Sequence, residues 1–209
     1  GEYAEMAASE GMLGIIWAGG FGEEVPVTVP FGGRKPILST NPIGMGFPIG
    51  DGSPMIIDYA TTVVAGSKIQ SFKDKNLLLP PDSVADKHGN RSNDPDAYLD
   101  GGFHLPFGGH KGYALMLAVE FFGRIFAGAD AFGVDDRGGP TFRHAGITMM
   151  VVKADLFQPL AEYATQAESL SNRVRSTQPA PGFDEVLVPG DLEARTREIR
   201  TRDGIPVPD

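Results

Sequence analysis

The segment FGGHKGYALM, residues 107–116, places two glycines, a histidine, a lysine and a further glycine directly before a long apolar run. The apolar run predicts a helix, and no Ser, Thr, Asp or Asn stands where it would cap the first N–H groups. A bound anion satisfies such donors, glycine lets the anion approach the backbone, and Lys111 adds a positive charge. An ordinary glycine-rich turn with an exposed lysine explains the pattern about equally well, because short Gly-rich motifs recur by chance.

Two further segments carry polar side chains at positions where a ligand could bind. Asp58 ends the apolar segment MIID, and an acid at the end of a strand can accept a hydrogen bond from a ribose hydroxyl. It can equally cap the helix that follows. Thr40 and Asn41 lie in the turn STNP, which Asn-Pro turn chemistry explains without any ligand.

The motifs of several enzyme classes are missing. There is no HExxH, no GxSxG and no Walker-type phosphate loop, and no GxGxxG follows a strand. His88, His104 and His144 lie in loops or before a strand without a sequence partner. Metalloprotease, serine hydrolase, P-loop and Rossmann functions therefore have no support, and no metal site is predicted.

Composition limits the class of protein further. The chain has 209 residues, 41% of them hydrophobic, which is enough for a substantial core. The formal net charge of −9 argues against sequence-independent binding of nucleic acid, which needs a basic surface. No cysteine is present, no apolar stretch reaches about 20 residues, and no secretory signal precedes the first strand. We expect a protein that avoids membranes and resides in the cytoplasm.

The hydrophobic pattern predicts a mixed α/β protein. Several strands follow one another without an intervening helix, so a regular doubly wound sheet fits poorly. Residues 73–102 are polar and rich in turn residues, which predicts a long surface excursion. The predicted strands are 12–17 and 146–152, both expected to be buried, with 37–38, 44–47, 55–58 and a short one at 185–188. The predicted helices begin near 63 and 191 and cover 112–127 and 158–177.

The helix at 112–127 is the strongest in the chain. It is apolar on nearly every face, with Glu120 and Arg124 as its only charges, so we expect it in the interior. We place a central cofactor-binding domain at 1–155. A C-terminal helical segment, 156–209, is expected to pack back on that domain.

Four segments occur in a characteristic order: GRKPILSTNPIGMGFP, MIIDYATT, LPFGGHKGYALMLAVEFFGRIFAGA and PAPGFDEVLVPGD. In this order they resemble the malate/L-lactate dehydrogenase family of NAD(P)-dependent oxidoreductases. This is the second, non-Rossmann group, which also contains ureidoglycolate and sulfolactate dehydrogenases and Δ1-piperideine-2-carboxylate reductase. The resemblance covers the chain from about residue 10 to its end.

The resemblance implies a non-Rossmann NAD(P)-binding fold with a mixed sheet and a buried central helix, and homodimers whose active sites draw on both subunits. By position it assigns cofactor contacts to three segments and a substrate contact to a fourth. The implied cofactor-binding residues are Asp58, Tyr59, Ala60, Thr61 and Thr62, then His110 and Lys111, then Gly190 and Asp191 in the late turn near 189–191; the implied substrate-binding residues are Thr40 and Asn41.

The function implied is hydride transfer between NAD or NADP and a small 2-hydroxy or 2-oxo (or imino) carboxylate such as malate or lactate. The family's catalytic histidine belongs to an N-terminal region that has no counterpart here, which leaves His110 as the first catalytic candidate in this chain. The alternative is a truncated, non-catalytic homologue that serves as a nucleotide-binding or dimerisation module. A structural domain with a coincidental Gly-His-Lys-Gly is a third reading.

Overall fold

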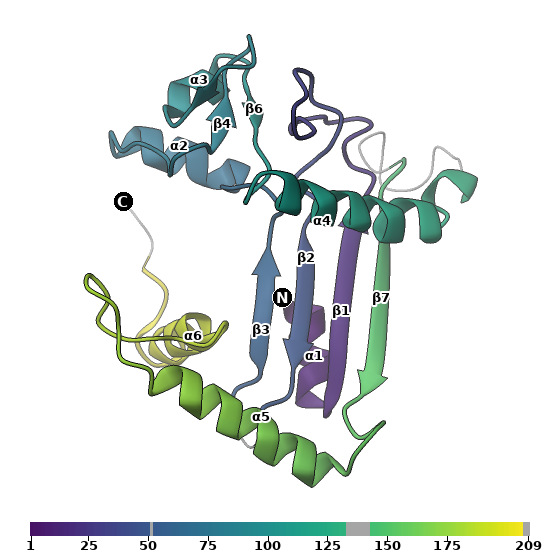
Figure 1. Ribbon diagram of the computed structural model, residues 1–209, viewed down its shortest axis with the longest axis vertical. Coiled ribbons are helices and arrows are strands. Elements are labelled where there is room, and N and C mark those ends of the chain that lie inside the picture. The colour runs from purple at the N-terminus through teal and green to yellow at the C-terminus, as the bar shows by residue number, and fades with distance from the viewer. Residues whose placement is uncertain (51, 133–142, 207–209) are drawn as a thin grey trace. The chain divides into compact units, whose positions relative to one another are not determined.

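A four-stranded sheet runs through the protein, seen in a computed structural model that describes residues 1–50, 52–132 and 143–206. Its strands lie side by side in the order β3-β2-β1-β7 (Figure 1). They are β1 (Met12–Gly19), β2 (Ile43–Phe47), β3 (Met55–Tyr59) and β7 (Gly146–Lys153). Four of the predicted strands and the mixed α/β class are therefore confirmed.

The chain divides into two compact units, and the division falls inside all four strands. Unit 1 comprises Gly1–Ile15, Gly44–Asp58 and Met150–Asp209, and unit 2 comprises Ile16–Ile43 and Tyr59–Met149. The division expected from the sequence, a central cofactor-binding domain at 1–155 with a C-terminal helical segment at 156–209 packed back on it, stays a prediction.

The described residues of unit 1 form three helices: α1 (Glu2–Ser9), α5 (Leu160–Arg175) and α6 (Asp191–Asp203). The small side chains of α1 are buried, with Ala4 fully inaccessible, because the helix packs tightly against glycine. A Cβ on Gly46 would lie 2.1 Å from the backbone oxygen of Ala4. Helices were predicted at 158–177 and after 191, and both are confirmed.

Within unit 2, residues 73–102 are more ordered than the predicted surface excursion. Short strands β4 (Val84–Ala85), β5 (Arg91–Ser92) and β6 (Phe103–His104) form an antiparallel sheet in the order β5-β4-β6. Helices α2 (Gly66–Asp74) and α3 (Pro95–Leu99) belong to the same region. A core of Val64, Ile69, Leu79 and Val84 holds it together, because apolar residues hidden among the turn signals find partners distant in sequence.

The central helix of unit 2 is α4 (His110–Glu120), which continues into the π-helical segment η1 (Phe121–Phe126) and then η2 (Ala129–Phe132). It packs closely on β1, since a Cβ on Gly19 would lie 2.8 Å from the Val119 backbone oxygen. Met116 and Val119 are fully buried. The expectation that the whole helix is interior is wrong at its end, where the side chains of Phe121, Ile125 and Phe126 are exposed.

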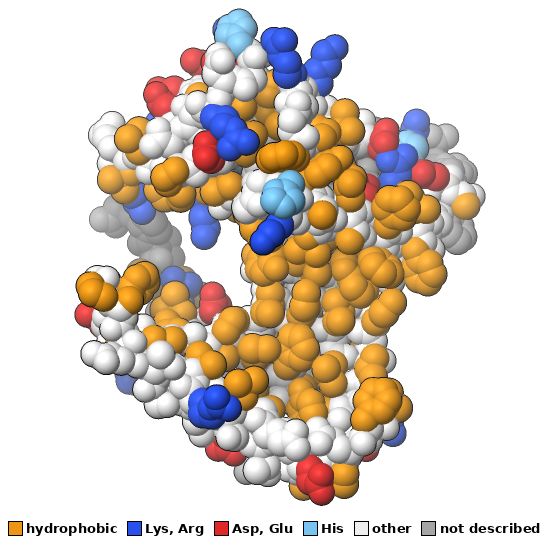
Figure 2. Space-filling model, viewed as in Figure 1, with side chains coloured by type: hydrophobic (Ala, Val, Ile, Leu, Met, Phe, Trp, Pro, Cys, Tyr) orange, Lys and Arg blue, Asp and Glu red, His pale blue; other side chains and the backbone are white. Residues whose placement is uncertain are grey.

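Three strand predictions need correction. Most residues of β7, an edge strand, are exposed; hydrophobic side chains gather on the visible face over the four-stranded sheet, β7 included (Figure 2). The pair 37–38 contributes only an isolated bridge between Leu38 and Thr28. Residues 185–188, all of them described, form no strand and lead as an irregular segment into the turn before α6.

Candidate functional site

The start of α4 presents His110 and Lys111 on the surface. Gly108 and Gly109 both have positive φ, 56° and 61°, and Gly109 occupies the N-cap position without a side-chain cap. A Cβ on Gly112 would lie 1.8 Å from the backbone oxygen of Phe107, so the turn needs glycine there. The side chains of His110 and Lys111 are exposed. An uncapped helix start with a lysine beside it suits an anionic group.

Two of the predicted ligand-binding segments contact each other within unit 2. The Thr61 hydroxyl donates to the backbone oxygens of Thr40 (3.1 Å) and Asn41 (2.9 Å), and the Thr61 N–H donates to Thr40 O at 2.9 Å. Thr62 donates to its neighbour Val64 O at 2.9 Å. Thr61 and Thr62 are buried. Their hydroxyls therefore fix the backbone that joins the end of β3 to the 40–41 turn.

The same segment is bonded to the turn that precedes α4. The Phe107 N–H donates to Thr61 O at 3.1 Å, and the exposed ring of Tyr59 lies edge-on to the Phe107 ring at 5.6 Å between centroids. Ala60, which lies between Tyr59 and Thr61 in the sequence, is half-buried. Within unit 2, the structure thus brings together the predicted segments at 40–41 and 59–62 and the start of α4.

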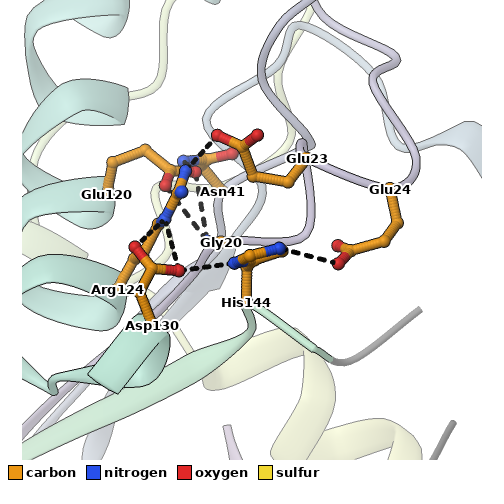
Figure 3. A network of polar contacts seen from close by, with 8 residues as sticks. All are labelled: Gly20, Glu23, Glu24, Asn41, Glu120, Arg124, Asp130 and His144. Atoms are coloured by element: carbon orange, nitrogen blue, oxygen red, sulfur yellow. Dashed lines mark hydrogen bonds and ion pairs between the residues drawn. The ribbon is translucent and has the colours of Figure 1, made fainter. Parts of the chain in front are cut away.

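A buried carboxylate that the sequence did not single out joins these segments. The side chain of Glu120, 9% exposed, accepts the Gly20 N–H through both oxygens, at 3.2 and 3.1 Å, and the Asn41 amide at 2.7 Å (Figure 3). Asn41 also donates to Met116 O at 3.2 Å and has a φ of 44°. Its side chain is directed at α4 and is buried. A lone acid in an apolar helix was the available signal, but its partners are far away in sequence.

A second, more exposed set of charges lies next to Glu120. Arg124 pairs with Glu23 and with Asp130, the latter at 3.0 Å (Figure 3). His144 lies between carboxylates, with Nδ1 2.5 Å from Asp130 and Nε2 3.6 Å from Glu24. The contact with His144, followed by that with Arg124, lowers the pKa of Asp130. These pairs fix the loop after β1, and sequence reasoning had left His144 without a partner.

Unit 1 holds the remaining predicted contacts. Asp58 is about half exposed and accepts the N-terminal ammonium of Gly1 at 2.6 Å. Close to it, the Ile56 N–H donates to Pro189 O at 3.1 Å, and Gly190 has a φ of 100° in the turn before α6. The structure therefore places the late turn against β3, two residues from Asp58.

Asp191 closes this turn. Its carboxylate accepts the Val188 N–H at 2.9 Å and both Nε (3.0 Å) and Nη2 (2.7 Å) of Arg175. The hydrogen bonds from Arg175 are the main reason that the pKa of Asp191 is lowered. The Asp191 side chain therefore supports the turn. Among the described residues, no group of three or more His, Asp or Glu side chains could hold a metal ion.

Comparison with known proteins places the chain in a family. The model of the malate/L-lactate dehydrogenase family matches residues 1–209. The chain belongs to this family, and the resemblance drawn from the four ordered motifs is confirmed.

Similar proteins are dehydrogenases by name. The chain is 32% identical over 208 residues to an L-sulfolactate dehydrogenase of Methanocaldococcus jannaschii and 30% identical over 214 residues to a malate dehydrogenase of Pyrococcus horikoshii. These alignments cover 99% of the chain and 58% of each relative, so the chain spans little more than half of their length.

Solved structures share the fold. A putative malate/lactate dehydrogenase from E. coli superposes with a TM-score of 0.83 at 28% identity, over 99% of this chain and 57% of that one. The sulfolactate dehydrogenase from M. jannaschii gives 0.82 at 30% identity, over 100% and 59%. The predicted family fold is therefore confirmed.

Proposed function

We propose that this chain is the cofactor-binding and central part of an NAD(P)-dependent oxidoreductase that acts on a small 2-hydroxy or 2-oxo (or imino) carboxylate. The observation that carries the proposal is the start of α4, where an uncapped helix and an exposed Lys111 follow two glycines of positive φ. When bound, the nicotinamide cofactor supplies or accepts the hydride. The protein contributes binding, orientation and proton transfer.

The proposed cofactor contacts lie in both units. Lys111 attracts a phosphate by charge, and the backbone at Gly108 is open, since an added Cβ would meet nothing within 4 Å. His110 lies beside Lys111 and is exposed. In unit 1, the half-exposed Asp58 carboxylate can accept from a hydroxyl. Residues 59–62 and the Gly190–Asp191 turn complete the proposed cofactor set.

The proposed substrate is a small carboxylate. Malate, lactate and sulfolactate in the names of relatives support a small carboxylate as the substrate class. Thr40 and Asn41 are proposed to lie beside it, with the Asn41 amide engaged by Glu120 and the backbone of the turn facing the ligand. His110 is the proposed proton donor or acceptor among the residues present.

A homodimer in the cytoplasm completes the proposal. The edge strand β7 exposes several apolar side chains, including Ile147 and Met149, which supports burial against a second copy. By length and composition alone, the described stretch His110–Ala131 could cross a membrane. Within it, Glu120 and Arg124 take part in polar networks with loop residues, as described above, which favours a helix of a folded domain.

Nucleotide titration tests the proposal. NADH and NADPH fluorescence is followed on the wild type, on Lys111→Ala and on Lys68→Ala, which changes another exposed lysine, in α2, and serves as the control. Loss of a charge-assisted contact worth about 1.5–3 kcal/mol predicts about tenfold to hundredfold weaker binding by Lys111→Ala alone. Equal binding by all three proteins would remove Lys111 from the cofactor site.

Turnover separates an enzyme from a nucleotide-binding module. The same chain is mixed with NAD or NADP and with malate, lactate or sulfolactate, and formation of the reduced cofactor is measured. Nucleotide binding with no turnover on any substrate would favour the module over the enzyme.

A further inference from the structure

A cavity of about 500 Å³ lies within unit 2, next to the start of α4. Its lining is about equally polar and apolar, with Leu105, Phe107 and three prolines among the apolar contributors. Glycines supply much of the rest, so backbone is accessible over a large part of the wall. A cavity of this size and composition is typical of sites for small organic ligands with one or two polar anchors.

Two arginines give the cavity a positive charge. Arg34 Nη2 donates to His88 O at 3.4 Å, and Arg91 Nη1 lies 3.4 Å from Asp82 Oδ2, in a pair of which both members are more than half exposed. A guanidinium carries five N–H donors, and each of these long contacts uses one nitrogen. Arg34, Arg91 and Asp82 all line the cavity, which leaves a formal charge of +1 on its side chains.

The cavity continues to the residues proposed to contact the cofactor. Phe31 lines the cavity, and its ring lies edge-on to the imidazole of His110 at 5.9 Å between centroids. Gly108 and Gly109, which immediately precede His110, also line it. A ligand that reaches Lys111 with one end can therefore place its other end in the cavity without leaving unit 2.

We propose that this cavity binds the adenosine 2′-phosphate end of NADP, with the adenine against the apolar wall and the phosphate held by Arg34 and Arg91. The inference rests on the proposed function and adds cofactor preference to it. Guanidinium groups recognise phosphate oxygens with paired N–H donors and also stack on planar rings. A ribose site for NAD uses a carboxylate on the 2′-hydroxyl, whereas here two guanidiniums outnumber the single Asp82 carboxylate.

Calorimetric titration with adenosine 2′,5′-bisphosphate and with ADP tests the inference on the whole 209-residue chain. We expect the bisphosphate to bind at least tenfold more tightly than ADP. Arg34→Ala and Arg91→Ala are each expected to reduce this preference to threefold or less. Arg34→Lys should give an intermediate preference, because lysine keeps the positive charge but lacks the paired N–H donors of a guanidinium. Lys68→Ala removes an equal charge outside the cavity and should keep the full preference.

The two ligands also control for misfolding, because a variant that has lost its structure loses ADP binding as well as the preference. A wild-type preference below threefold overturns the inference, as does a preference that survives both Arg34→Ala and Arg91→Ala. NADH and NADPH titrations separate this failure from failure of the proposed function. Equal binding of both dinucleotides leaves the oxidoreductase proposal standing and removes the 2′-phosphate site, whereas binding of neither removes both.

Discussion

Two carboxylates organise the two units by different physical means. In unit 2, Glu120 is buried, and its hydrogen bonds within the described part of the chain come from neutral donors, the Gly20 N–H and the Asn41 amide. In unit 1, Asp191 keeps 14% of its side-chain surface exposed and is held by the Arg175 guanidinium as well as by the Val188 N–H. Glu120 supports the turn that is predicted to contact the substrate, and Asp191 supports the turn that is predicted to contact the cofactor.

The difference decides how each unit should respond to mutation, acid and salt. A buried carboxylate that accepts from neutral groups depends on those hydrogen-bond donors. Removing the carboxylate leaves the donors unpaired and shielded from water. A partly exposed ion pair is weaker, is screened by salt and loses its charge only in strong acid. The contacts of Glu120 should therefore be sensitive mainly to substitution, and the Arg175–Asp191 pair to salt as well.

The largest effect is expected for Glu120→Ala. It leaves the Gly20 N–H and the Asn41 amide without acceptors, which should lower the free energy of unfolding by about 3 kcal/mol. Glu120→Gln keeps one acceptor oxygen but turns an NH₂ group towards a donor, and should cost about half as much. Urea unfolding followed by the emission of Trp17, the only tryptophan, reads unit 2, since its ring stacks on Phe122 at 4.4 Å. A loss below 0.5 kcal/mol, roughly the scale of a neutral surface change, would contradict the role given to Glu120.

The sequence singled out those segments of the candidate site that are local in the chain. The glycine turn, Lys111 and the 59–62 segment are contiguous motifs, so their order and type were readable directly. Glu120 was missed as a connector because Gly20 and Asn41 are 100 and 79 residues away from it. Nothing local to an apolar helix with one acid distinguishes a solvated carboxylate from a buried one.

The fold shows the same division between local and distant information. Apolar runs located β1, β2, β3 and β7, but hydrophobicity reports neither the order of strands nor which one lies at an edge, so β7 was expected to be buried. The small sheet of β4, β5 and β6 was missed because its strands have two residues each, too short for a period to be visible.

The next effect concerns acid, which should affect unit 2 first. His104 is 1% exposed, neither ring nitrogen has a hydrogen-bond partner among the described residues, and burial lowers its pKa from 6.5 to about 4. The unfolded chain takes up this proton near pH 6.5 and the folded one does not, so stability is full above pH 6.5 and falls towards pH 4. The separation of the two pKa values corresponds to a loss of about 3 kcal/mol at most.

Urea midpoints from Trp17 emission at pH 7, 5.5 and 4.5 measure this loss. His104→Phe should flatten the dependence over that window, because an apolar ring of similar size replaces the imidazole. His88→Ala, at an exposed histidine of the same unit, should leave the dependence as it is in the wild type. A wild-type slope that persists in His104→Phe would assign the acid sensitivity to another group.

A smaller effect is expected for Asp191→Ala in unit 1. The substitution removes the acceptor of the Val188 N–H and the partner of Arg175, which together should stabilise the turn by about 1–2 kcal/mol. Because the pKa of Asp191 is lowered in the folded chain from its ordinary 3.8, this stabilisation is present above pH 3.8 and is lost below it. Hydrogen exchange at residues 188–194, measured by mass spectrometry at pH 7, should accelerate in the variant while exchange in α4 does not change. Equal acceleration in both places would mean that the turn is not stabilised locally.

The smallest expected effect is a difference in how salt changes the contributions of Glu120 and Asp191 to stability. Raising NaCl from 0.1 to 1 M shortens the screening length from about 10 to 3 Å, which weakens the partly exposed Arg175–Asp191 pair and hardly reaches Glu120. Salt also changes the stability of the whole chain, so the quantity to compare is the difference between each variant and the wild type at one salt concentration. For Asp191→Ala this difference should shrink by a few tenths of a kcal/mol, and for Glu120→Ala it should stay constant. If both differences shrink together, the carboxylate of Glu120 interacts with charges through solvent, and the contrast between a dry acid and a paired one fails.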